Sequence, residues 1–236
     1  MRVTNQMMST TYLKDLNKNL NNLNTLNKQL TTGKEISKPS DNPFKTARIM
    51  QMYSDISANK QYNENIKDTI NWLDTTDVAL EQIGNSAQRI RELMVSAGNA
   101  SYGSDEKNAL KEEINEKINE IAQVLNTNYD GKYIFGGTKS LSKPVGVEKD
   151  SNGNNILVFK DDNGNSFNEE GKAYIKNADG TITRDANGNL AVEANPKPEY
   201  EKLLNQMNAN LSVEVSNGVN MNYNVGTPSI LTLWSY

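Results

Sequence analysis

Three short segments carry the side chains most capable of chemistry, because each gathers aspartate and asparagine oxygens around a glycine. They read Asp-Xaa-Asn-Gly-Asn and occupy residues 150–154, 161–165 and 185–189. Such oxygens suit calcium, but an EF-hand-type loop needs alternating carboxylates and a distal glutamate, and no segment completes that set. Asn-Gly also supplies the positive φ angles of tight hairpin turns. We therefore interpret the segments as hairpin turns and expect calcium binding no tighter than millimolar.

Enzymatic chemistry is restricted by the residue types that the sequence lacks. The 236 residues include no histidine and no cysteine, so Ser-His-Asp, Cys-His and the common zinc constellations are excluded, as are disulfides. A glycosidase with paired carboxylates stays conceivable, but no carboxylate pair lies at an identifiable strand end. We predict a protein that is not an enzyme, with no catalytic, cofactor-binding or metal-binding residues.

The bulk composition favours a long, thin helical bundle over a single thick core. Apolar residues make up only 36% of the chain and aromatic residues 7%. The net charge of −4 offers no broad basic field for nucleic acid, and no run approaches the ~20 apolar residues of a membrane helix. The N-terminus has no apolar signal core, so an exported protein would not use the general secretory signal. We predict neither nucleic-acid nor membrane partners.

A stripe of leucines marks the first predicted helix, over residues 5–32. The gaps of three and four between them place the leucines on one narrow face of a helix. They are Leu13, Leu16, Leu20, Leu23, Leu26 and Leu30. One interpretation is an ordinary amphipathic helix packed on its own domain, and the other is a coiled-coil end that becomes ordered only on assembly. The second interpretation predicts loosely held residues 1–32 in the isolated monomer.

A long helical hairpin is predicted after a break at Pro39 and Pro43, because two prolines so close forbid a continuous helix. We expect one helix over residues 45–97, antiparallel to a second over 104–128. A span of ~50 residues at ~1.5 Å each would be ~75 Å long. The apolar positions that keep heptad spacing on the first helix are Ile49, Met52, Ile56, Ile66, Ile70, Leu73, Leu80, Ala87 and Met94.

The pattern changes to short β runs and turns in the C-terminal half. Residues 145–225 alternate β runs with Asn/Asp/Gly turns, and the clearest hairpin lies at 211–225. The last residues, 229–236, are apolar and resemble the exposed beginning of an element. The predicted fold class is α+β, a long antiparallel α-helical rod with a β-rich outer domain of hairpins. The predicted segments are 1–42, a terminal coiled-coil segment; 43–138, the helical hairpin; 139–210, the variable outer domain; and 211–236, the returning hairpin and the start of a missing helical region.

Three stretches of the chain carry motifs in a fixed order. The first is the start at residues 1–12, with Arg2-Val3-Thr4. The second runs from Gln29-Leu30-Thr31-Thr32-Gly33-Lys34 through the Pro-Ser-Asp-Asn-Pro motif. The third leads from Gln61-Tyr62 through Arg91-Glu92-Leu93 to 131–137, Gly-Lys-Tyr-Ile-Phe-Gly-Gly. The motif residues are Gly33, Pro39, Ser40, Asp41, Pro43, Arg48, Arg91, Glu92 and Leu93. Together the three stretches resemble the flagellar hook-associated protein 3 family of the flagellin superfamily.

The resemblance implies a structural subunit that stacks between hook and filament of a bacterial flagellum. Self-association and contacts with neighbouring hook-associated protein and flagellin subunits would follow, with the six leucines as the assembly interface. The resemblance also implies an extracellular protein, exported through the flagellar export apparatus with a chaperone. Family members usually end in long C-terminal helices, and this chain stops at Tyr236, where they should begin. We therefore expect the leucine stripe to lack a partner within this chain.

Two alternatives remain open. Filament flagellins resemble this start but usually carry an alanine- and aspartate-rich segment after the glycine, where this chain has residues 39–43, Pro-Ser-Asp-Asn-Pro. The other alternative is a secreted adhesin with a calcium-dependent β domain on a helical stalk. A calcium-dependent shift in melting temperature would favour it.

Overall fold

The computed structural model describes residues 5–36, 38–98, 102–185 and 187–232, which fall into two compact units. One unit comprises residues 1–61 and the other residues 62–236. The predicted α+β class is confirmed, because long helices are combined with small antiparallel sheets. The four predicted segment boundaries stay a prediction.

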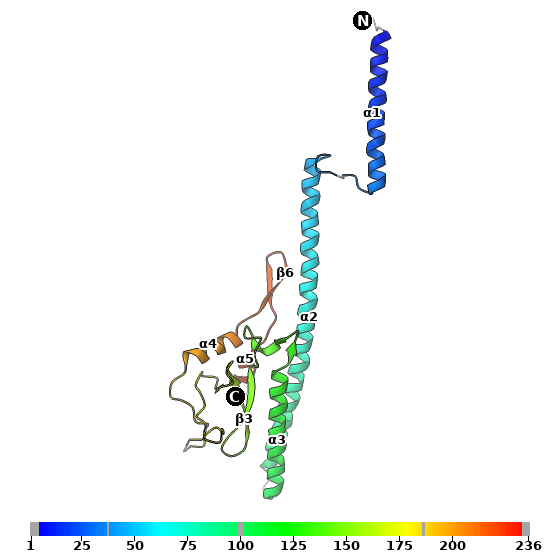
Figure 1. Ribbon diagram of the computed structural model, residues 1–236. Coiled ribbons are helices and arrows are strands. Elements are labelled where there is room, and N and C mark those ends of the chain that lie inside the picture. The colour runs from blue at the N-terminus through cyan, green and yellow to red at the C-terminus, as the bar shows by residue number, and fades with distance from the viewer. Residues whose placement is uncertain (1–4, 37, 99–101, 186, 233–236) are drawn as a thin grey trace. The chain divides into compact units, whose positions relative to one another are not determined.

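The unit of residues 1–61 holds helix α1, Asn5–Thr32, and the beginning of helix α2, Pro43–Ala97 (Figure 1). Gly33 ends α1 with a φ of 66°, a left-handed conformation that glycine adopts without steric cost. Asn42 caps α2, since its Oδ1 accepts a hydrogen bond from the Lys45 backbone N–H at 3.0 Å. Pro43, whose fixed φ suits the first turn of a helix, is the first residue of α2.

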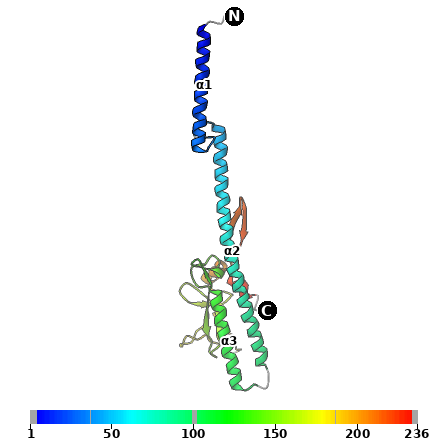
Figure 2. The ribbon, with the colours of Figure 1, turned by 90° about the vertical axis from the view of Figure 1, so that its right-hand side faces the viewer.

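The unit of residues 62–236 is built on a helical hairpin. Helix α3, Ser104–Leu125, lies antiparallel to the later part of α2 (Figures 1 and 2). Arg89 pairs with Glu113 at 2.7 Å, and Ser86 donates to Glu120 at 3.1 Å. The two predicted helices are therefore confirmed, although α3 ends three residues before position 128.

The face of α2 that packs in this hairpin is not the predicted one. The buried residues of α2 are Thr69, Trp72, Thr76, Ala79, Ile83, Ser86 and Leu93. They keep heptad spacing, but five of the seven lie one position before a residue of the predicted seam, which leaves Ile70, Leu73 and Met94 at 50%, 41% and 63% exposure. The prediction failed because it followed the aliphatic residues, whereas the buried stripe includes Thr, Ser and Trp.

The strands form small antiparallel sheets around this hairpin. The first is β1, Asn128–Tyr129, with β2, Lys132–Tyr133, followed by the 3-10 turn η1, Ile134–Gly136. The second has the order β3, Val145–Lys149, β4, Asn155–Lys160, and β5, Ser166–Phe167. The predicted hairpin near 211–225 is present as β6, Ser212–Ser216, and β7, Val219–Asn222. It is tied to α2, because Asn65 Nδ2 donates to the Glu214 carbonyl at 3.0 Å.

Two short helices lie where the sequence predicted β runs or an exposed end. Helix α4, Pro198–Met207, has a proline in its first turn and buries Tyr200 and Met207, a spacing that suits one helical face. Helix α5, Thr227–Thr232, buries Ile230 to 5% exposure. The expectation that the end beginning at Ile230 would be exposed is therefore wrong for that residue, while positions 233–236 of the same segment lie outside the described residues.

Two apolar clusters hold this unit together. The larger cluster joins Trp72, Ala79, Ile83, Ile121, Leu125, Ile134, Phe135, Val145 and Ile230. The smaller cluster joins Phe159, Phe167, Ala173, Tyr200 and Met207. Because the larger cluster draws on α2, α3, η1, β3 and α5, it fixes the β-rich part against the helical hairpin.

Candidate assembly surface and turns

The six predicted interface leucines share one feature, which is solvent exposure along the whole of α1. No described residue of α1 is buried. The exposed fractions are 54% for Leu13, 44% for Leu16, 54% for Leu20, 60% for Leu23, 64% for Leu26 and 84% for Leu30. An apolar stripe this continuous is typical of a surface that packs against another chain or element. The assembly role of the leucines stays a prediction.

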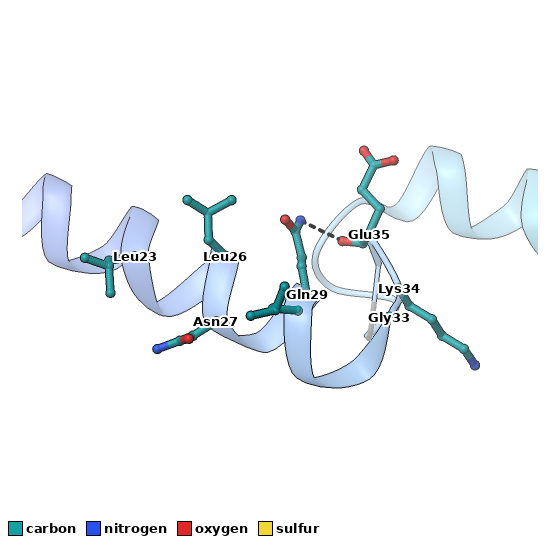
Figure 3. A pocket seen from close by; sticks show the side chains of 8 residues that line it. Leu23, Leu26, Asn27, Gln29, Gly33, Lys34 and Glu35 are labelled. Atoms are coloured by element: carbon teal, nitrogen blue, oxygen red, sulfur yellow. Dashed lines mark hydrogen bonds between the residues drawn. The ribbon is translucent and has the colours of Figure 1, made fainter.

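The motif residues after α1 shape the connection to α2. Gln29 Nε2 donates to the Glu35 carbonyl at 3.0 Å, as the dashed line in Figure 3 shows, beside a hollow lined by Leu23, Leu26 and Leu30. Asp41 Oδ2 accepts the Lys38 backbone N–H at 2.9 Å. These contacts tie Glu35 back to the end of α1 and close a turn over residues 38–41.

The remaining motif residues divide between exposed and buried positions. Pro39, Ser40 and Arg48 are exposed in the unit of residues 1–61. In the other unit Leu93 is buried at 3% exposure in the helical hairpin, whereas Arg91 and Glu92 face solvent. Leu93 therefore has a packing role, and the exposed residues are free to contact other molecules.

The three Asp-Xaa-Asn-Gly-Asn segments form tight turns closed by their own aspartates. Asp161 Oδ1 accepts the backbone N–H groups of Asn163 and Asn165 at 2.9 and 2.7 Å, and its Oδ2 accepts Asn165 Nδ2 at 2.8 Å. Asp150 makes the same contacts and also pairs with Arg184 at 2.6 Å. Asp185 accepts the backbone N–H groups of Asn187 and Asn189, while residue 186 lies outside the described residues. Both oxygens of Asp150 and Asp161 are thus occupied by donors.

Two further turns of the same design were missed by the sequence analysis. They start at Asn168 and Asn177, and in both the backbone N–H of the first residue donates to the carbonyl four positions on. Gly171 and Gly180 take φ angles of 73° and 85°, as the glycines of the other three turns do. The sequence does contain a signal for both turns, since Asn-Xaa-Xaa-Gly places an asparagine three residues before a glycine. They were missed because only segments with an adjacent Asn-Gly pair were interpreted as turns.

Calcium should not stabilise these turns. We expect calcium to bind no more tightly than with a millimolar dissociation constant. Each carboxylate already accepts hydrogen bonds from within its turn, and the set of oxygen ligands is incomplete. Asp161→Ala should instead lower the free energy of unfolding by about 1 kcal/mol, with or without calcium, through loss of the turn's hydrogen bonds. Isothermal titration calorimetry checks this, and a micromolar site lost in Asp161→Ala would restore the adhesin hypothesis.

A carboxylate cluster lies on the sheet of β3–β5. The Glu148 side chain is only 11% exposed and accepts hydrogen bonds from Lys160, Lys176 and Ser166. Burial by itself raises the pKa of the Glu148 carboxyl, but these donors outweigh burial and hold the pKa below its ordinary value of 4.5. The cluster ties three strand segments together, so we interpret it as structural.

The lowered pKa of Glu148 makes part of the stability dependent on pH. A carboxyl with a depressed pKa in the folded state contributes stability above its unfolded pKa of about 4.5 and loses it as the pH falls through the folded value. We expect Glu148→Gln to lower the free energy of unfolding most at neutral pH, and the difference from wild type to shrink below about pH 4.5. Urea titrations from pH 3 to 7 check this against Glu112→Gln, an exposed site on α3. A difference that stays constant over that range would contradict the assignment.

The described residues form neither a candidate metal site nor a membrane-spanning helix. Within them, no group of three or more aspartate or glutamate side chains is placed to hold a metal ion. Among the described helices, none combines the length and apolar character needed to cross a bilayer.

The sequence matches a known family over more than half of its length. Residues 3–140 match the bacterial flagellin N-terminal helical region, so the chain belongs to the flagellin family. A flagellin of Salmonella paratyphi A (strain ATCC 9150 / SARB42) is 29% identical over 145 residues, covering 61% of this chain and 29% of that flagellin. The chain therefore spans less than a third of the curated relatives that it matches.

The fold is shared with a protein of Vibrio parahaemolyticus that is assigned as a flagellar hook-associated protein. The TM-score is 0.53 at 18% identity, over 82% of this chain and 65% of the other. Flagellar hook-associated protein 3 of Legionella pneumophila gives a TM-score of 0.49 at 18% identity, over 75% and 39% of the two chains. The predicted resemblance to the flagellin superfamily is confirmed by the family match, and the fold resemblance to a hook-associated protein is confirmed by the Vibrio parahaemolyticus structure.

Proposed function

We propose that this chain is a structural subunit of the bacterial flagellum that joins the hook to the filament. The observation that carries the proposal is the leucine stripe of α1, exposed over its whole length in a member of the flagellin family. Burying each leucine would contribute ~1.5–3 kcal/mol before ordering costs. Six such side chains are enough to drive pairing with helices of other subunits.

The role at the junction rests on the motif that follows α1. Residues 39–43 read Pro-Ser-Asp-Asn-Pro, the segment that distinguishes the chain from filament flagellins, and the fold is shared with a hook-associated protein. Partners would be further copies of this chain, hook-associated protein and flagellin subunits. The chain would leave the cell through the flagellar export apparatus with a chaperone and become extracellular.

No catalytic step is proposed. The sequence contains no histidine or cysteine, and the described carboxylates cap turns, form ion pairs or face solvent, with no group of three or more placed together. The aspartates of the three Asp-Xaa-Asn-Gly-Asn turns and the Glu148 cluster accept hydrogen bonds from within the chain and serve its own stability. A structural role accounts for these features without requiring a substrate.

Deleting the gene in the bacterium that encodes it tests the proposal. We expect cells that still make hooks but release flagellin monomers into the medium instead of growing filaments, because the filament would lack its attachment. Supplying the gene from a plasmid should restore filaments. Cells that grow ordinary filaments without the gene would contradict the junction role, and cells with complete hooks and no secreted flagellin would indicate a filament subunit.

A further inference from the structure

The charge of the sequence is divided unequally between the two units. Residues 1–61 contain nine lysines and arginines against four acids, a net charge of +5. Residues 62–236 contain 16 basic and 25 acidic residues, a net charge of −9, which together give the −4 of the whole chain. Opposite charges on separate units favour contacts between copies in which unlike units meet.

A groove on the basic unit combines exposed apolar side chains with two cations, Lys34 and Arg48, that form no ion pair within the described part of the chain. The groove has a volume of about 520 Å³ and is walled by residues 34–36 and the first turns of α2. Phe44, Met52 and Tyr53 line it at 81%, 50% and 61% exposure. Glu35 and Lys45 neutralise each other at 2.7 Å, so Lys34 and Arg48 leave a net positive rim.

The acidic unit carries a helical face of matching character. It is the α2 stripe that the sequence predicted as a seam and that the α2–α3 hairpin leaves open. Ile70 and Leu73 are 50% and 41% exposed there, and Asp74 and Asp77 are exposed beside them. No ion pair involves these two aspartates among the residues that the structure describes.

We infer that the groove of one copy binds the acidic α2 face of a second copy, in a head-to-tail contact. Phe44 supplies an apolar anchor, and Lys34 and Arg48 face Asp74 and Asp77 of the other copy. The contact is heterologous, so a bound pair keeps a free face on one subunit and a free groove on the other, and a chain of subunits can grow. This inference rests on the proposed self-assembly and names the surfaces that it uses in addition to the leucine stripe.

The test uses the whole chain and two charge-reversal variants, followed by sedimentation velocity in low salt. The groove variant is Lys34→Glu with Arg48→Glu, and the face variant is Asp74→Lys with Asp77→Lys. We expect wild type to self-associate and each variant alone to associate at least about tenfold more weakly. An equimolar mixture of the two variants should regain the wild-type association constant, because the face variant keeps an intact groove and the groove variant keeps an intact face. Raising the salt to about 0.5 M should weaken all association.

The matched control reverses two other lysines of the basic unit, Lys18→Glu with Lys28→Glu on α1, and should leave the association within about threefold of wild type. Any of three results would overturn the inference. The mixture could associate as weakly as each variant alone, the control could associate as weakly as the groove variant, or wild type could remain monomeric. Leu20→Asp with Leu23→Asp should retain the contact in solution. If that variant abolishes filament growth while the groove variant associates normally, the contact is wrong and the proposed function stands.

Discussion

Replacing Leu20 and Leu23 by aspartate should abolish filament growth on hooks while leaving residues 62–236 folded. Both leucines are more than half exposed in the isolated chain, so nothing in its own core depends on them. In an assembly that buries the stripe, the change removes about 3–6 kcal/mol of apolar burial per subunit and places two charges in an apolar contact. Electron microscopy of cells expressing the variant counts the filaments.

A matched control separates the stripe from the added charge. Asn21→Asp with Thr25→Asp introduces the same two charges on the opposite face of α1 and should leave filaments intact. The free energy of unfolding of both variants, measured by urea titration and followed through the buried Trp72, should stay within about 0.5 kcal/mol of wild type. Filaments of normal number in the leucine variant would show that the stripe is not an assembly surface.

Replacing Gly137 by alanine should lower the free energy of unfolding by about 3–5 kcal/mol. Gly137 follows η1 with φ 57° and ψ −130°, a conformation that residues with a side chain rarely adopt. An added Cβ would lie 2.4 Å from the backbone oxygens of both Gln206 and Met207 at the end of α4. Backbone atoms cannot move aside as a flexible side chain does, so the strain and the clash add.

Gly164→Ala is the control for that variant. Gly164 also has a positive φ, 84°, but a Cβ there meets no atom within 4 Å. Gly164→Ala should therefore lower the free energy of unfolding only through the unfavourable positive φ, by about 1–2 kcal/mol. Urea denaturation measures both, and equal losses would show that the contact with the end of α4 contributes nothing.

The sequence was sufficient to predict the helices because their signals are local. Pro43 starts α2, Asn42 caps it and Gly33 ends α1, and each of these roles depends on neighbouring residues alone. The face of α2 that packs is not a local property. Trp72 is buried because residues of α3, η1 and the β1–β2 hairpin lie in the same apolar cluster. Heptad counting on aliphatic residues selected the neighbouring stripe.

The C-terminal half was predicted less well for the same reason. Tyr200 and Met207 keep helical spacing after Pro198, but the surrounding turns favoured a β interpretation of the whole region. Ile230 is buried only because residues distant in sequence, such as Phe135, lie beside it: the Thr227 Oγ1 donates to the Phe135 carbonyl at 2.8 Å. Of the candidate surfaces, the leucine stripe could be predicted from its spacing alone. The groove beside Phe44 could not, because it exists only where residues 34–36 run past the start of α2.

Imaging a tagged copy of this chain on intact flagella tests the junction role most directly. The tag belongs in one of the exposed turns, such as residues 161–165, which include none of the residues of the proposed contact surfaces. The proposed function predicts label confined to a short band where each hook meets its filament, with motility retained. Label distributed along the whole filament, or absent from the flagellum, would contradict it.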